Sequence, residues 1–319
     1  MVPATPPRLT GRRRRLAMRA AAVALALLAG PGLAPAAGLA DDPAYAAFDA
    51  GDYEQALRLA RVAAAKGEAA AHTLVGRILL EGLAGAADPE AAATWYRQGA
   101  ALGDANAAFA LALLHAGGQG VARDRKAAAD YFAAAAAKGH VLATYNLGLL
   151  YIAGDGRPND PERAAALIAK AAAAGHAPAE YDLGALYQNG AGVRRDDEKA
   201  AHWIGRAAEA GHVEAEVEYA VMLFKGRGVP RDEARGAWFF LSAAEKGNPV
   251  AQNRLARLYW YGIVFAIDPV VAAKWHLLAR AAGVSDLELD VKLAALSGEM
   301  RAAAEAGARA FRARASGVE

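Results

Sequence analysis

Large apolar and small residues recur along the chain with a period of 36 residues. Glycines open six consecutive units at this spacing and close the last one, at Gly67, Gly103, Gly139, Gly175, Gly211, Gly247 and Gly283. When the opening glycine is counted as position 0, position 8 holds a bulky residue in every unit: Val75, Leu111, Leu147, Leu183, Tyr219 and Leu255. Position 9 is always glycine or alanine. Because positions 4, 8 and 12 lie on one face of a helix, this pattern predicts an amphipathic helix that a second helix can approach closely.

Each unit also carries the signals that end one helix and begin another. Position 15 is always glycine, which accepts the left-handed conformation after a helix end: Gly82, Gly118, Gly154, Gly190, Gly226 and Gly262. Position 21 is always aspartate, whose side chain can cap a new helix: Asp88, Asp124, Asp160, Asp196, Asp232 and Asp268. We therefore predict an all-α chain with one helical hairpin per unit.

The six units resemble the Sel-1-like repeat family. Residues 179–193, AEYDLGALYQNGAGV, closely follow that family's repeat signature. The resemblance implies six Sel-1-like repeats over residues 67–283, stacked as a right-handed superhelical α-solenoid of tandem helical hairpins similar to tetratricopeptide repeats. It also implies an adaptor or scaffold function. In the last repeat, Val264 replaces the second loop glycine, which leaves the conformation of that loop open.

Helical caps are expected at both ends of the array. Residues 41–66 contain Gly51-Asp52-Tyr53, which resembles a tetratricopeptide turn, and are expected to form an N-terminal tetratricopeptide-like cap. Residues 284–319 are expected to form a C-terminal helical cap. In this cap, Ser285 and Glu288 are predicted to form a capping box, and a final helix is predicted to start after Ser297. An apolar cover for the last hairpin is predicted from Leu287, Val291 and Leu296.

The first 40 residues have the composition of a secretory signal peptide. A basic stretch ending at Arg19 precedes an apolar stretch, and small residues allow cleavage after Ala36 or Ala40. An uncleaved membrane anchor is the alternative, although prolines and glycines in this segment make a poor membrane helix. We expect a periplasmic or secreted protein that does not span the membrane after cleavage. The chain has no cysteine, which excludes disulfides, thiolate metal sites and a lipidated cysteine.

Removal of the signal peptide reverses the sign of the net charge. The whole chain has 36 Lys and Arg against 34 Asp and Glu, and all six basic residues of the first 40 would leave with that segment. The mature chain is then slightly acidic, so nucleic acid is not an expected partner.

Residues that could support catalysis or metal binding are few and scattered. None of the four serines lies in a nucleophile elbow, and the glycine-rich loops lack the Lys-Ser/Thr of a phosphate-binding loop. His140, His176 and His212 recur at position 1 as turn residues, too far apart for one metal. Glu180, Glu214 and Glu218 are interpreted as a solvated acidic patch. We expect no enzymatic activity, no cofactor and no metal.

Helix phasing turns positions 3, 6, 10 and 13 of the first helices away from the hairpin core, toward the concave groove of a tetratricopeptide-like array. The predicted binding residues are Phe109, Leu113, Tyr145, Leu149, Ile152, Tyr181, Gln188, Phe224 and Trp260. Such an apolar and aromatic strip suits a peptide. The alternative is that these rings pack between adjacent repeats.

The sequence thus favours an exported, non-enzymatic scaffold that binds a protein or peptide partner in its groove, in the assembly or regulation of a cell-envelope complex. Two other functions stay open. One is β-lactam binding or hydrolysis, associated with a cysteine-rich branch of the family. The other is glycan or peptidoglycan binding on the groove aromatics.

Overall fold

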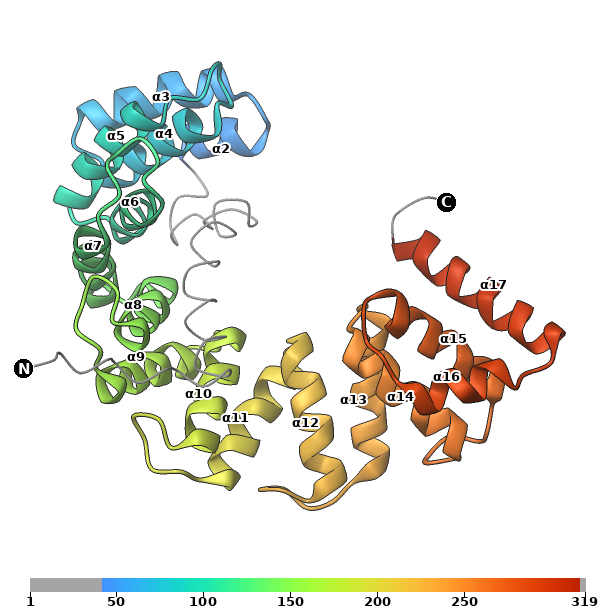
Figure 1. The fold of residues 1–319 in the computed structure, drawn as a ribbon. Coiled ribbons are helices and arrows are strands. Elements are labelled where there is room, and N and C mark those ends of the chain that lie inside the picture. The colour runs from blue at the N-terminus through green and yellow to red at the C-terminus, as the bar shows by residue number, and fades with distance from the viewer. Residues whose placement is uncertain (1–41, 316–319) are drawn as a thin grey trace, which may run out of the picture. The chain divides into compact units, whose positions relative to one another are not determined.

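A computed structural model describes residues 42–315, which contain 16 α-helices and no strand (Figure 1). The predicted all-α solenoid of helical hairpins is therefore confirmed. The predicted signal peptide lies outside the described residues, so its cleavage and the alternative of an anchor stay predictions. None of the described helices combines the length and hydropathy needed to cross a membrane.

The described residues divide into two compact units, with the boundary between His176 and Ala177. The helices of the first unit are α2 (Pro43–Asp49), α3 (Tyr53–Ala65), α4 (Ala69–Glu81), α5 (Pro89–Ala101), α6 (Ala105–Gly117), α7 (Arg125–Ala137), α8 (Val141–Ala153) and α9 (Pro161–Ala173). Those of the second unit are α10 (Ala177–Asn189), α11 (Asp197–Glu209), α12 (Val213–Lys225), α13 (Glu233–Glu245), α14 (Pro249–Tyr261), α15 (Pro269–Ala281), α16 (Leu287–Ala294) and α17 (Gly298–Ala315). Within each unit the even-numbered helices from α4 to α14 are first helices of a repeat, and each packs against the helix that follows it.

The repeated glycines and aspartates set the helix ends as predicted. All six glycines at position 15 adopt positive φ, between 62° and 75°. The carboxylates at position 21 accept a backbone N–H in the first turn of the second helix, at 2.9 Å in every repeat: Asp88 from Ala91, Asp124 from Ala127, Asp160 from Arg163, Asp196 from Lys199, Asp232 from Arg235 and Asp268 from Val271. These contacts satisfy backbone donors that a helix start otherwise leaves unpaired.

The small residue at position 9 receives a large side chain from the second helix of the same repeat. A Cβ added to Gly184 would lie 2.4 Å from a side-chain carbon of Ile204, and one added to Gly148 would lie 2.9 Å from Ile168. Glycine at these positions therefore lets the two helices of a hairpin pack closely, which the alternation of positions 8 and 9 predicts.

The C-terminal cap corrects two expectations. Asp286, and not Ser285, caps α16 by accepting the N–H of Leu289 at 3.3 Å. Leu287 and Val291 are 80% and 70% exposed, whereas Leu289 and Leu293 form the buried face. Both pairs are spaced i, i+4, so α16 has two apolar stripes, and the sequence pattern alone does not distinguish the stripe that packs. The final helix begins after Ser297, as predicted, and its Phe311 ring packs on Trp275 at 5.4 Å.

Candidate functional site

In five of the six repeats, the side chain at position 6 contacts a residue at the start of the helix that follows the repeat. Three such contacts join an aromatic ring to a histidine, with centroid distances of 4.4 Å for Phe109–His140, 4.8 Å for Tyr145–His176 and 5.0 Å for Tyr181–His212. Hydrogen bonds replace the rings elsewhere, because Thr73 donates to Asp104 and Asn253 donates to Asp286 at 2.9 Å. In these five repeats position 6 therefore helps to fix the repeat on its neighbour.

The histidines at position 1 also cap helices. The Nδ1 atoms of His140 and His212 accept the backbone N–H of Ala143 at 3.1 Å and of Ala215 at 3.3 Å. An accepting Nδ1 must keep its lone pair, so this contact favours the neutral ring. Burial also lowers the pKa of His140 below its ordinary value, against the opposing effect of Asp104. Within residues 42–315 no cluster of three His, Asp or Glu side chains is arranged to hold a metal ion.

The predicted groove residues differ in exposure between the two units. Phe109, Leu113, Tyr145 and Leu149 are buried in the first unit, where Ile152 is half-buried. In the second unit Tyr181, Gln188, Phe224 and Trp260 are all half-buried. The first unit thus matches the packing alternative at its buried positions, whereas the second unit retains partly exposed side chains on its first helices. The binding role of the nine residues stays a prediction.

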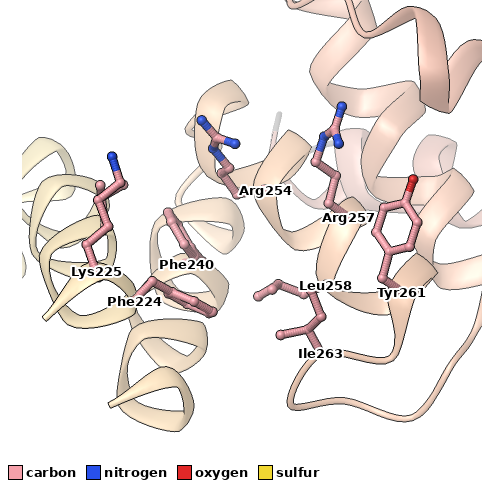
Figure 2. A pocket seen from close by; sticks show the side chains of 9 residues that line it. Phe224, Lys225, Phe240, Arg254, Arg257, Leu258, Tyr261 and Ile263 are labelled. Atoms are coloured by element: carbon pink, nitrogen blue, oxygen red, sulfur yellow. The ribbon is translucent and has the colours of Figure 1, made fainter. Parts of the chain in front are cut away.

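One of these residues, Phe224, lines an apolar cavity of about 320 Å³ in the second unit. The lining residues come from α12, α13, α14 and the loop after α14: Val221, Phe224, Lys225, Phe240, Arg254, Arg257, Leu258, Tyr261 and Ile263 (Figure 2). The rings of Phe224 and Phe240 lie 5.7 Å apart at its base. This cavity is the candidate site, since it lies between the first helices of two adjacent repeats and continues the predicted groove positions.

Basic side chains lie along one side of the apolar cavity. Figure 2 shows the nitrogen ends of Lys225, Arg254 and Arg257 on one side, away from Leu258 and Ile263. Arg257 donates to Asp286 at 2.9 Å and to Glu288 at 3.1 Å, and the hydrogen bond to Asp286 raises the pKa of this guanidinium. Within the described part of the chain, neither Lys225 nor Arg254 forms an ion pair.

Comparisons with known proteins decide the family. The model of the Sel1 repeat matches seven consecutive segments, at residues 49–68, 69–104, 105–140, 141–176, 177–212, 213–248 and 249–284. The chain belongs to the Sel1 repeat family. The short first match extends the Sel1 repeats into the region that we expected to be a tetratricopeptide-like cap. Among curated proteins, none matches the chain.

Two solved structures support the same Sel1 repeat fold. One is c5321, a protective antigen present in uropathogenic Escherichia coli strains, at 25% identity and a TM-score of 0.76, covering 95% of this chain and 64% of that chain. The chain thus spans less than two thirds of that relative. The other is a Sel1 repeat protein from Oxalobacter formigenes, at 28% identity and a TM-score of 0.65, covering 76% of this chain and 97% of that one. Solenoids of Sel1 repeats generally serve as scaffolds for protein–protein interaction.

The expected solvated acidic patch of this Sel1 repeat protein is wrong for Glu180 and holds for Glu214. Glu180 is buried and accepts an ion pair from Arg206 at 2.8 Å, and Glu218 pairs with Arg227 at 3.2 Å. For Glu180 the reason is that position 5 faces the second helix of its own repeat, where Arg206 compensates the buried carboxylate. Only Glu214 is exposed.

A second buried carboxylate, at the same repeat position, organises a serine and a lysine. Glu216 accepts from Ser242 at 2.8 Å and from Lys246 at 2.7 Å. The side chain of Glu216 is 2% exposed. The equivalent residue in the preceding Sel1 repeat is Glu180, which forms an ion pair with Arg206. Because a buried glutamate with a basic partner recurs at position 5 of both repeats, we interpret this pair as a contact that stabilises the packing of the two helices of one repeat.

The cavity includes residues that helix phasing did not select. Lys225 and Tyr261 occupy position 14 and Arg254 occupies position 7, which border the predicted positions 6, 10 and 13. A signal for the cavity was nevertheless present, because position 25 is alanine in five repeats and glycine only at Gly236. A Cβ on Gly236 would lie 2.7 Å from the Phe224 ring. The exchange of alanine for glycine therefore makes room for the ring that forms the base of the cavity.

Proposed function

We propose that this Sel1 repeat protein is an exported, non-enzymatic scaffold. It binds a protein or peptide partner on the first-helix face of its second unit and serves the assembly or regulation of a cell-envelope complex. The observation that carries the proposal is the run of partly exposed groove residues on α10, α12 and α14 that ends in an open apolar cavity. Aromatic side chains in such a position offer large contact area at low entropic cost.

Export is supported by the signal-like composition of residues 1–40. The test is a fusion of residues 1–60 to an alkaline phosphatase that lacks its own signal and is active only after export. We expect phosphatase activity, and mass spectrometry of the full-length protein should find a mature N-terminus at Ala37 or Asp41. An inactive fusion would refute export, and an intact N-terminus in the membrane fraction would favour the anchor.

Partner binding is tested by capture from an envelope extract with the tagged mature chain and its Tyr181→Ala variant. Tyr181 is half-buried at position 6, so truncation should reduce contact area on the groove. We expect a loss of about fivefold or more of a specifically captured protein, with the fold retained by circular dichroism. Equal capture by both proteins would place the interaction on another surface. A matched assay with a chromogenic β-lactam is expected to show no hydrolysis.

A further inference from the structure

Two departures from the repeat pattern lie beside the cavity of the second unit. The first is Gly236, which lets the Phe224 ring settle against α13. The second is Val264, whose φ of 67° makes it the only non-glycine residue with positive φ among residues 42–315. It takes the place of a glycine that has φ of 66° to 73° at Gly120, Gly156 and Gly228. A β-branched residue is strained in this conformation, and such strain concentrates at functional sites.

Val264 cannot take the close position that glycine takes in the equivalent loops. In the equivalent loops, a Cβ added to Gly120, Gly156 or Gly228 would lie 2.2, 2.1 or 1.9 Å from a backbone oxygen at the start of the preceding second helix. Because Val264 carries a Cβ, its loop cannot approach the start of α13 as closely. Ile263 in this loop lines the cavity and is 37% exposed.

The size and lining of the cavity limit its occupant. Its volume of about 320 Å³ lies at the lower end of the range of about 300–1,000 Å³ typical of small-molecule sites. Val221, Phe224, Phe240, Leu258 and Ile263 line it with carbon atoms. A single aromatic or branched aliphatic side chain matches this space, because burial of its apolar surface against such a lining is favourable.

The charge around the cavity defines what should flank that side chain. Lys225 on α12 and Arg254 on α14 are exposed and lie on different helices at the rim. Arg257 is already compensated by Asp286 and Glu288. Two cations without acidic partners in the described structure attract carboxylates, and their separation over two helices suits acidic side chains on both sides of one apolar residue.

We infer that the cavity between α12 and α14 binds an acidic segment of a partner protein. One bulky apolar side chain of that segment enters the cavity, while neighbouring Asp or Glu side chains contact Lys225 and Arg254. This inference rests on the proposed scaffold function and specifies the chemistry of its partner.

The test uses a labelled nine-residue peptide, blocked at both ends, with a central phenylalanine between aspartates. Fluorescence anisotropy measures its Kd for the mature protein. We expect binding that weakens with added salt, since exposed charge pairs are screened over about 10 Å at 0.1 M ionic strength. Replacing the central phenylalanine by alanine, or the aspartates by lysines, should each raise Kd at least tenfold.

Two variants of the protein locate the binding site. Lys225→Glu combined with Arg254→Glu reverses two exposed rim charges, and Ile263→Asp places a charge in the apolar lining. Each should raise Kd at least tenfold while circular dichroism melting shows a folded chain. The matched control, Arg61→Glu on α3 with Lys66→Glu at its C-cap, makes the same change in net charge at exposed residues outside the cavity and should leave Kd within twofold.

The outcomes separate this inference from the scaffold proposal. The acidic-segment inference is overturned if the acidic peptide does not bind, if the lysine peptide binds equally well, or if the rim variant binds like the control. If envelope capture still depends on Tyr181 in any of these cases, the scaffold function stands and only the assigned occupant is wrong. If envelope capture also does not depend on Tyr181, both the acidic-segment inference and the scaffold proposal are wrong.

Discussion

At the residue scale, each repeat depends on a carboxylate that caps its second helix. Asp196→Ala should lower the free energy of unfolding by about 0.5–2 kcal/mol, because the N–H of Lys199 loses its acceptor. Partner capture should not change. The matched control is Asp197→Ala, which removes only an ion pair with the largely exposed Arg195 and should cost about 1 kcal/mol or less. Denaturant-induced unfolding measures the stability of both variants. Loss of capture in Asp196→Ala at unchanged stability would give the capping aspartates a functional role.

The backbone of Val264 allows a second test at this scale. Val264→Gly should raise the free energy of unfolding by about 1 kcal/mol, because a left-handed conformation costs a side-chain-bearing residue about 1–2 kcal/mol. The reverse exchange, Gly228→Val, should lower it by about 3 kcal/mol, since the new Cβ would meet the backbone oxygen of Asp197. Urea denaturation compares them. A destabilised Val264→Gly variant would mean that the valine side chain contributes packing that outweighs the strain.

At the scale of helices, the side chain at position 6 can pack between repeats or bind a partner, and its exposure distinguishes the two roles. Tyr145 is 6% exposed and Tyr181 is half-buried, although each ring contacts the histidine of the next repeat. Tyr145→Ala should lower stability by about 3–5 kcal/mol, as for buried aromatic residues generally. Tyr181→Ala should cost less stability and weaken partner capture by about 1–2 kcal/mol or more. Melting temperature and capture are measured on both variants. Equal stability losses would make position 6 a packing position throughout.

The sequence predicts the helix boundaries well because they depend on local chemistry. A glycine at position 15 and an aspartate at position 21 act on backbone groups within a few residues, so their spacing is sufficient. The packing stripe of α16 could not be chosen in this way, because Leu287 with Val291 and Leu289 with Leu293 have the same spacing. That choice depends on which neighbours are present, and those come from other parts of the chain.

The candidate cavity was only partly predictable for a related reason. Phase along one helix selects Phe224, but the space beside it depends on Gly236 in α13 and on the loop of Val264. Exceptions to a repeat pattern are visible in the sequence. Whether they produce a cavity depends on how three helices pack together, which the sequence pattern does not give. The burial of Phe109 and Tyr145 likewise depends on contacts with a neighbouring repeat.

At the scale of the whole molecule, stability should follow the number of intact repeats. Deletion of residues 139–174 removes one full period, so the remaining hairpins keep their register and should unfold cooperatively with a lower melting temperature. Deletion of only 18 residues from the same start should abolish cooperative unfolding, because the remaining second helix meets the wrong face of its neighbour. Circular dichroism melts compare the two proteins. Equal loss of cooperativity in both would contradict the 36-residue unit.

The contacts between position 6 and the next helix start restrict the order in which the repeats can follow one another. Thr73 meets a carboxylate, Phe109 and Tyr145 meet imidazoles, and Asn253 meets a carboxylate. If a repeat ending in an aromatic junction were moved in front of Asp104, a ring would face a charge in place of a hydroxyl donor. The hairpins share one shape, yet their junctions are matched pairs. Sel1 repeats of this chain are therefore interchangeable as folds and not as neighbours, so recombination among them would be restricted to junctions of the same chemical type.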